Sequence, residues 1–198
     1  MFSGIIEEVG TVRSIEECPG SRKMTIACKK VIKGVAVGDS ISVNGVCLTV
    51  TNINDNQFDV DIVAETLEKS NLNSIAEESK INLERAMRYN QRVSGHLVQG
   101  HVDTQAKVLD INKTEEWTQI EFEVDSDYKK YCIYKGSIAI DGVSLTISKV
   151  TSRGIQVALI PHTLSNTILS NYKIDQHVNI ETDMVGKFIE NFAGAVSQ

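Results

Sequence analysis

The sequence predicts an all-β protein in which two homologous antiparallel domains follow one another and a short α-helix ends the chain. Three observations predict this: an internal repeat with an offset of 97 residues, short alternating runs rich in Val, Ile and Thr in both halves, and a change to helical spacing in the last segment. With 198 residues, 41% of them hydrophobic and 23% charged, the chain can bury one or two cores and lacks the composition of a disordered protein.

The repeat is clearest in one stretch of eleven residues. Ser40–Val50 aligns with Ser137–Ile147, and six of the eleven positions are identical. At the same offset Ile81–Glu84 aligns with Val178–Glu181. The alignment extends through both halves, so we predict a first domain over residues 1–95, a second over residues 96–183 and a helix over residues 184–198.

Short runs with period two predict the strands of each domain. In the first half these runs are Thr11–Ile15, Ser40–Val43, Leu48–Ile53 and Phe58–Ile62, a spacing typical of an antiparallel barrel or sandwich. Asn44-Gly45 lies between β-branched residues and is the strongest short-range hairpin signal in the chain, and Asp141-Gly142 repeats it. Cys47 and Ser144 are therefore each expected to begin a strand after a tight turn.

Three segments have the character of helices. Ala64–Ser70 and its repeat partner His162–Leu169 predict one short helix in each domain. In the last segment, apolar residues recur three or four positions apart behind a plausible cap at Thr182-Asp183; they are Val185, Phe188, Ile189, Phe192 and Val196. Such a helix packs on its own domain, or it joins symmetric copies of the chain through its apolar stripe.

Composition excludes several classes of function. The net charge of −6 and the pI of about 5.3 argue against a nucleic-acid partner, because an acidic surface repels phosphate backbones. No apolar run approaches the roughly 18 to 20 residues of a membrane-spanning helix, and the first residues lack a basic region before an apolar one, so we expect a cytoplasmic protein. The four cysteines, Cys18, Cys28, Cys47 and Cys132, have no metal-binding spacing and are expected to be free thiols.

Several motifs, in order and on both arms of the repeat, resemble riboflavin synthase. They are Met1–Ile6, Asn44–Val50, Gly95–Asp103, Asp141–Thr146 and Leu159–Thr163. The likeness extends from Met1 to about Asp183, and the terminal helix matches in position more than in sequence. One such motif alone would be weak, but the whole ordered set is specific to this family.

The resemblance implies a fold and a reaction. The fold is two closed, six-stranded Greek-key barrels, and three copies assemble as a homotrimer through their C-terminal helices. The reaction is the dismutation of two molecules of 6,7-dimethyl-8-ribityllumazine without a metal or redox cofactor: one molecule transfers a four-carbon unit to the other, which gives riboflavin and 5-amino-6-(D-ribitylamino)uracil. Each site lies between the N-terminal barrel of one subunit and the C-terminal barrel of its neighbour. Some relatives sit inside a shell of lumazine synthase.

Three residues match candidate catalytic positions of the family. Cys47 is a candidate for activating or adding to the lumazine ring, and otherwise is a small buried hydrophobe. His101 is a proton-transfer candidate because an imidazole titrates near neutrality, and otherwise is a histidine at a strand edge. Ser40 could position a nucleophile or hold a proton, and otherwise starts a strand. Because Cys47 and Ser40 belong to one domain and His101 to the other, they can act together only where unlike barrels meet.

The remaining family positions are binding groups, most of which would read the flat heterocycle with backbone atoms. We assign Gly4, Ile5, Ile6, Cys47, Leu48, Thr49, Asp61, Ile62, Val63, Ala64, Glu65 and Thr66 to the pocket of the first barrel. We assign Gly100, His101, Val102, Lys135, Ser144, Leu145, Thr146, Ala158, Leu159, Ile160, Pro161, His162 and Thr163 to the pocket of the second. Thr49 and Thr146 are equivalent hydroxyls, as expected if both pockets hold a ribityl chain, although threonine is also common in strands.

The alternative function is a lumazine or flavin carrier of the same fold, which holds a fluorophore and performs no chemistry. A carrier would be expected to lose the cysteine and histidine positions, and this chain has both. A flavin reductase would need a nicotinamide-binding domain, for which the chain has no glycine-rich motif. His96 and His177 are interpreted as ordinary histidines and Trp117 as a strand aromatic of the second barrel.

Overall fold

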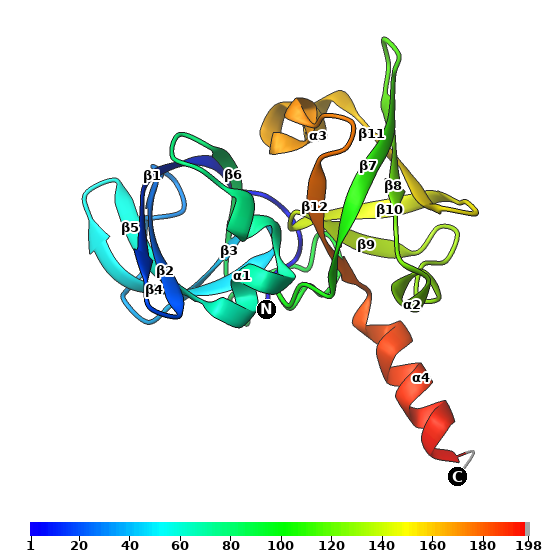
Figure 1. Ribbon diagram of the computed structural model, residues 1–198, viewed down its shortest axis with the longest axis horizontal. Helices are drawn as coiled ribbons and strands as arrows, with labels where there is room; N and C mark the ends of the chain where they lie inside the picture. Colours follow the sequence, from blue (N-terminus) through cyan, green and yellow to red (C-terminus); the bar gives the residue numbers. More distant parts are fainter. Residues whose placement is uncertain (197–198) are drawn as a thin grey trace.

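The computed structural model describes the backbone of residues 1–196, which forms two closed β-barrels and a C-terminal helix (Figure 1). The strands of the first barrel are β1 (Glu8–Cys18), β2 (Ser21–Ala27), β3 (Ser40–Val43), β4 (Val46–Asn54), β5 (Gln57–Val63) and β6 (Lys80–Arg85). They pair antiparallel in the ring order β1-β2-β5-β4-β3-β6, and β1 pairs with β6 to close the barrel. The predicted strand Ser40–Val43 has the same bounds in the structure, and the others are longer by a few residues.

The second barrel repeats the first strand for strand. Its strands are β7 (Thr104–Lys113), β8 (Thr118–Glu123), β9 (Ser137–Ile140), β10 (Val143–Val150), β11 (Gly154–Leu159) and β12 (His177–Thr182). Their ring order, β10-β11-β8-β7-β12-β9, is that of the first barrel with each strand replaced by its repeat partner. The all-β fold of two tandem six-stranded antiparallel barrels is therefore confirmed. Trp117 lies in the turn just before β8 rather than within a strand, which corrects its assignment.

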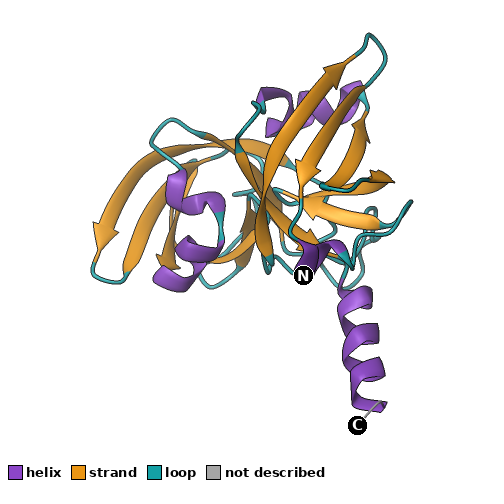
Figure 2. Cartoon of the chain, turned by 45° about the vertical axis from the view of Figure 1, so that its right-hand side comes forward, coloured by secondary structure: helices purple, strands orange, loops and turns teal. Residues whose placement is uncertain are grey.

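Short helices follow β5 and β11 in the two barrels (Figure 2). The helices are α1 (Ala64–Lys69), α2 (Ser126–Lys129), α3 (Pro161–Asn166) and α4 (Met184–Val196), with 3₁₀ turns η1 (Asn71–Ser74) and η2 (Ile168–Asn171). The helix predicted over His162–Leu169 ends at Asn166, because Thr167 is extended and its hydroxyl accepts the Leu169 N–H to start η2. None of the helices within residues 1–196 is long and apolar enough to cross a membrane.

Each barrel has its own core, built from the inward side chains of its strands. Fully buried residues such as Met24, Phe58 and Val60 fill the first core, and Val108, Ile120 and Phe122 fill the second. A third, small cluster joins the barrels: Phe2 and Val98 exchange two backbone hydrogen bonds of 2.7 and 3.0 Å and are buried with Ala139. The segments that lead into the two barrels therefore pair with each other.

The two predicted hairpin turns also meet between the barrels. Asn44 and Gly45 have φ of 46° and 80°, and Asp141 and Gly142 have 42° and 79°, as a type I′ turn requires. The turns are so close that a Cβ on Gly45 would lie 2.6 Å from the Gly142 nitrogen. Glycine is needed here both for the positive φ and for the close approach of the two backbones.

Two equivalent asparagines connect the barrels with a nearly symmetric set of hydrogen bonds. Asn82 donates its side-chain amide to the Asp141 carbonyl at 2.9 Å and accepts the Ile168 N–H at 2.9 Å. Asn179 donates to the Asn44 carbonyl at 2.8 Å and accepts the Asn71 N–H at 2.7 Å. These groups are buried, so the bonds fix the two barrels against each other.

Asp141 breaks this symmetry, since Asn44 stands at its place in the first barrel. Its carboxylate is fully buried and accepts bonds from the Asn71 side chain at 2.9 Å, the Asn179 N–H at 2.7 Å and the Tyr172 hydroxyl at 2.5 Å. Burial raises the pKa of Asp141 to about 6 despite these bonds. Burial beside Asp141 also raises the pKa of Tyr172 well above its usual value.

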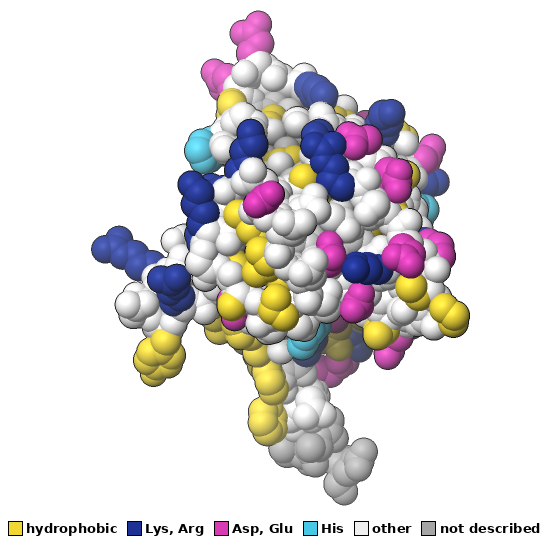
Figure 3. Space-filling view, turned by 90° about the vertical axis from the view of Figure 1, so that its left-hand side faces the viewer, with side chains coloured by type: hydrophobic (Ala, Val, Ile, Leu, Met, Phe, Trp, Pro, Cys, Tyr) yellow, Lys and Arg dark blue, Asp and Glu magenta, His cyan; other side chains and the backbone are white. Residues whose placement is uncertain are grey.

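Helix α4 begins after β12 and projects away from both barrels (Figures 1 and 2). The predicted cap at Asp183 is confirmed, because its side chain accepts the Val185 N–H at 3.0 Å. The Lys187 ammonium lies 2.6 Å from the Asp103 carboxylate and ties the first turn to the second barrel. Val185, Phe188, Ile189 and Phe192 are each more than half exposed, and hydrophobic side chains follow one side of the helix in Figure 3. The side chain of Val196 and residues 197–198 of the predicted helix lie outside the described residues.

Candidate functional site

The segments that precede the barrels are exchanged between them. The Gly100 carbonyl, which precedes the second barrel, accepts the N–H of Cys47 in the first at 2.8 Å. The Gly4 carbonyl, which precedes the first barrel, accepts the N–H of Ser144 in the second at 2.7 Å. Two residues further along each segment, Val102 packs on the core of the first barrel and Ile6 packs on the core of the second barrel. The assignment of each leading segment to the pocket of its own barrel is therefore wrong, because each crosses to the other barrel.

The candidate first pocket lies on the outer face of the first barrel. Along β4, Cys47 and Thr49 point outward while Leu48 lies in the core, and along β5 the outward residues are Asp61 and Val63. Since β4 and β5 are neighbours, the outward side chains form one surface. Ile62 is fully buried, so it and Leu48 could reach a ligand only with backbone atoms. The surface continues into α1, where Ala64 and Glu65 are exposed and Thr66 is half-buried.

The candidate second pocket has the same plan on β10 and β11. Ser144 and Thr146 point outward from β10, and Leu145 is turned to the core. On β11 and α3, Ala158, Ile160, Pro161 and His162 are exposed, Thr163 is half-buried and Leu159 is buried. Lys135 is exposed and donates its backbone N–H to the Ile147 carbonyl at 2.9 Å, next to Thr146. The predicted binding residues of each strand pair thus share one outer surface, with the buried ones beneath it.

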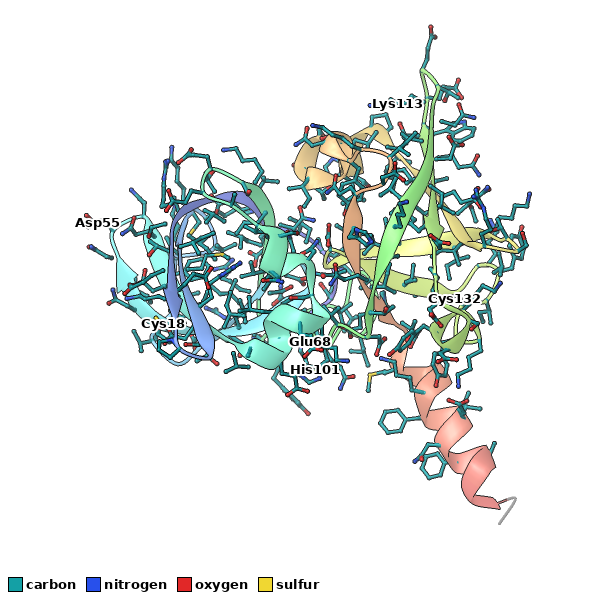
Figure 4. All side chains as sticks on the ribbon, viewed as in Figure 1. Cys18, Asp55, Glu68, His101, Lys113 and Cys132 are labelled. Atoms are coloured by element: carbon teal, nitrogen blue, oxygen red, sulfur yellow. The ribbon has the colours of Figure 1, made fainter. Side chains whose placement is uncertain are left out.

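The exchange places the backbone that precedes His101 beside Cys47 within one chain. His101 directly follows Gly100, whose carbonyl is bonded to the Cys47 backbone, and its side chain is exposed. In the view of Figure 4, His101 and Glu68 are labelled at the same lower edge of the first barrel. Cys47 is half-buried and its thiol is free. The leading segment of the second barrel thus contacts the first barrel within a single chain, next to Cys47.

Ser40 lies on the same sheet surface and also borders a cavity. It pairs with Thr49 across β3 and β4, and Ser42 pairs with Cys47, so Ser40 and Cys47 are diagonal neighbours on one face. Ser40 lines a cavity of about 630 Å³ together with Ile5, Glu84 and Arg85. It could therefore serve either the Cys47 surface or this cavity.

Comparison with known proteins identifies the family. Residues 3–86 and 99–183 each match the lumazine binding domain. Riboflavin synthase of Bacillus subtilis is 46% identical over 97% of this chain and 89% of its own length, and that of Saccharomyces cerevisiae is 43% identical over 96% and 85%. The chain belongs to the riboflavin synthase family. Two solved structures share its fold at 23% identity: LumP with 6,7-dimethyl-8-(1'-D-ribityl) lumazine, with a TM-score of 0.84, and LumP with riboflavin, with 0.87; each covers 92% of this chain, and this chain covers 99% and 100% of them.

Two buried glutamates in this riboflavin synthase relative were missed by sequence reasoning. Glu84 accepts the Ser3 and Gly4 N–H groups at 2.8 and 3.0 Å, and Glu181 accepts those of Gln99, Gly100 and His101 at 2.6, 2.8 and 3.0 Å. Burial raises the pKa of both carboxyls, although the N–H groups oppose that shift. The signal was an acidic residue at the same place in both copies of a strand otherwise rich in buried residues.

The half-buried His96 is a third such residue, which the sequence analysis interpreted as an ordinary histidine. Its Nδ1 lies 2.7 Å from the Ser144 hydroxyl, so it reaches the second pocket from the linker between the barrels. Burial lowers the pKa of His96, and the Asp183 carboxylate opposes that shift. A neutral imidazole can exchange a hydrogen bond with Ser144, which connects the linker to the pocket. A contact over 48 residues leaves no spacing signal in the sequence.

Proposed function

We propose that this chain is a transferase that dismutates two molecules of 6,7-dimethyl-8-ribityllumazine to riboflavin and 5-amino-6-(D-ribitylamino)uracil. The observation that carries the proposal is the pair of outer surfaces of like construction, one on β4 and β5 and one on β10 and β11. A reaction between two copies of one molecule needs two similar pockets and a fixed orientation between their ligands. Family membership supports the same reaction.

We assign different chemical roles to the residues of the two pockets. In this proposal the first pocket includes the thiol of Cys47 and the imidazole of His101, and the second includes the hydroxyl of Ser144; the bond between the Cys47 N–H and the Gly100 carbonyl supports the first grouping. In the proposed reaction Cys47 adds to or activates a lumazine ring, His101 transfers protons and Ser40 positions one of these groups. Thr49 and Thr146 face the ribityl chains. One lumazine gains the four carbons that the other loses, so the pair is balanced without an external oxidant.

We further propose a homotrimer, joined through α4, in which the first pocket of one subunit faces the second pocket of a neighbour. The exposed stripe of Phe188, Ile189 and Phe192 on a projecting helix supports this assembly. We expect Phe188→Ser with Phe192→Ser to give a monomer by sedimentation and to remove turnover. Val37→Ser, at an exposed apolar residue outside the helix, is the control and should leave a trimer. A monomeric wild-type protein with full turnover would contradict the assembly.

The test of the reaction is an anaerobic incubation of the metal-free protein with 6,7-dimethyl-8-ribityllumazine. Riboflavin is followed by its absorbance at longer wavelength, and the substrate consumed is counted for each riboflavin formed. Two consumed for one formed supports dismutation. Tight, fluorescent binding without riboflavin would instead identify a carrier and remove the catalytic roles of Cys47, His101 and Ser40 together.

A cytoplasmic location stays a prediction from the sequence, and association with a lumazine synthase shell stays a prediction of the family resemblance. Cell fractionation tests the first. Co-sedimentation of the chain with lumazine synthase tests the second, and separate sedimentation of the two proteins would contradict it.

A further inference from the structure

One buried carboxylate accepts hydrogen bonds from the backbone segment that carries His101. Glu181, on β12, is 4% exposed and accepts three consecutive N–H groups: its Oε1 takes that of Gln99 at 2.6 Å, and its Oε2 takes those of Gly100 and His101 at 2.8 and 3.0 Å. Bonds to an ionised acceptor are stronger than neutral ones, and three of them fix the direction of the segment. The carboxylate therefore fixes the backbone position from which the His101 side chain extends.

The same segment holds Cys47. Gly100 donates its N–H to Glu181 and accepts the Cys47 N–H with its carbonyl at 2.8 Å. The contact is close, because a Cβ built on Gly100 would lie 2.6 Å from the Cys47 Cβ. Gly100 thus connects the Glu181 carboxylate to the backbone of Cys47, the candidate nucleophile. It also directly precedes His101, the candidate acid-base residue.

The repeat supplies a counterpart without these two side chains. Glu84 accepts the N–H groups of Ser3 and Gly4, and the Gly4 carbonyl accepts the Ser144 N–H at 2.7 Å. Ile5 stands where His101 stands in the other copy, and Ser144 stands where Cys47 stands. The two glutamates are almost equally buried, with 3% and 4% exposure, and Glu84 also accepts the Ser3 hydroxyl at 2.9 Å.

We propose that Glu181 is a positioning residue for riboflavin formation, which acts by holding His101 and Cys47 in register across Gly100. The inference rests on the proposed function. Glu84 holds the segment that bonds to Ser144, which carries neither a thiol nor an imidazole, and we expect its contribution to be to ligand binding. A purely structural role would give Glu181 and Glu84 similar effects on kcat.

The first experiment compares Glu181→Gln with Glu84→Gln. Glutamine keeps the shape but replaces one accepting oxygen by an amide N–H₂, which faces a backbone N–H without a bond. We expect Glu181→Gln to lower kcat by about 10- to 100-fold with KM changed less than about threefold, because positioning errors act on the chemical step. We expect Glu84→Gln to raise KM and to lower kcat less than about fivefold. Equal kcat losses in the two variants would overturn the proposal.

The second experiment needs no turnover and measures the alkylation rate of Cys47 by iodoacetamide, read by peptide mapping. We expect at least a threefold change of this rate in Glu181→Gln and no change in Glu84→Gln. Cys18, a half-buried thiol of the same barrel, is the internal control. Burial raises the pKa values of Cys28 and Cys132 to about 12 and 11, which keeps those thiols unreactive. An unchanged Cys47 rate in Glu181→Gln would also overturn the proposal.

These readings separate the two claims. If the wild-type protein forms no riboflavin, the proposed function fails, while the alkylation rates still report whether Glu181 holds Cys47. Should Glu181→Gln fail to fold, Gly100→Ala and Gly4→Ala repeat the comparison, since each added Cβ would lie 2.6 Å from the Cβ of Cys47 or Ser144. We then expect a larger kcat loss for Gly100→Ala than for Gly4→Ala, and equal losses would overturn the proposal.

Discussion

The two barrels share one arrangement of strands and differ in many side chains. Both have the same ring order, the same type I′ turn, a buried glutamate that holds a leading segment, and an asparagine that crosses to the other barrel. They differ at Cys47 against Ser144, Ile5 against His101 and Asn44 against Asp141. The backbone contacts of the glutamates and asparagines are thus of the same kind in both barrels, whereas these three differences lie at the proposed pockets and at the boundary between the barrels.

The exchange of leading segments decides what these differences mean. If each segment served its own barrel, Cys47 would share a pocket with Ile5, and Ser144 with His101. Because the segments cross, the backbone just before His101 bonds to Cys47, and the backbone just before Ile5 bonds to Ser144. In the proposed site both reactive side chains therefore belong to the same pocket, and two pockets of one plan treat two identical substrates differently.

The largest expected effect comes from making the first pocket resemble the second. In Cys47→Ser with His101→Ile, each reactive group is replaced by the residue at the equivalent position of the repeat. We expect kcat to fall by roughly 1000-fold, within the range for loss of a nucleophile or an acid-base group, while the Kd for 6,7-dimethyl-8-ribityllumazine changes less than about threefold. Stopped assays give kcat and fluorescence titration gives Kd.

Cys18→Ser is the control for this pair, since it removes a thiol of the same barrel that lies elsewhere on β1. Wild-type kcat in the double variant would show that the asymmetry of the pockets has no part in the reaction.

The fold could be predicted from the sequence because local rules decide it. Alternation gave the strands, and Asn44-Gly45 requires positive φ whatever surrounds it. The crossing of each leading segment to the other barrel could not be predicted. An internal repeat aligns each leading segment with its own barrel and does not show which barrel the segment packs against. The bonds that fix the barrels against each other join distant residues, such as Asn179 to Asn44 over 135 positions. The partners of Glu84 and Glu181 are backbone N–H groups, which every residue except proline has, so the sequence does not show which of them each glutamate binds.

The contact between the two turns is tested by Gly45→Ala. The residue has φ of 80°, and the new Cβ would lie 2.6 Å from the backbone of Gly142. We expect the free energy of unfolding to fall by about 3 to 4 kcal/mol, from the left-handed backbone and from overpacking of the boundary. Gly20→Ala is the matched control, because Gly20 has φ of 76° and nothing within 4 Å of its added Cβ. We expect Gly20→Ala to lower the free energy of unfolding by about 1 kcal/mol. Equal losses for Gly45→Ala and Gly20→Ala in urea titrations would mean that the contact between the two turns does not contribute to stability.

Asp141→Asn tests the asymmetry at the boundary, since Asn44 already occupies the equivalent position. Burial raises the pKa of Asp141 from 3.8 to about 6, so the folded state binds its proton more tightly than the unfolded state does. Its contribution to stability is therefore complete below about pH 4 and is lost as the pH rises through about 6. The difference is roughly 2 to 3 kcal/mol between those limits.

We expect the free energy of unfolding of Asp141→Asn to be less dependent on pH in this range than that of the wild type. Urea titrations at several pH values from 4 to 7 measure this difference, and Glu84 and Glu181 contribute equally to both proteins. Parallel curves for the two proteins would show that the Asp141 carboxyl does not titrate in this range.

The smallest expected effects are at two hydroxyls that should be equal. Ser70 accepts the Leu72 N–H at 3.4 Å and donates to the Thr66 carbonyl at 2.6 Å, and Thr167 does the same for Leu169 at 3.3 Å and Thr163 at 2.8 Å. Each starts a 3₁₀ turn after a short helix, so Ser70→Ala and Thr167→Ala should each cost about 1 kcal/mol. In the described part of the chain no hydrogen bond joins the Ser70 and Thr167 side chains to a common partner, so their costs should add in the double variant. Equal, additive losses in urea titrations are what a repeated scaffold requires. A difference of more than about 1 kcal/mol would mean that the barrels have diverged in their backbone supports as well as in their pockets.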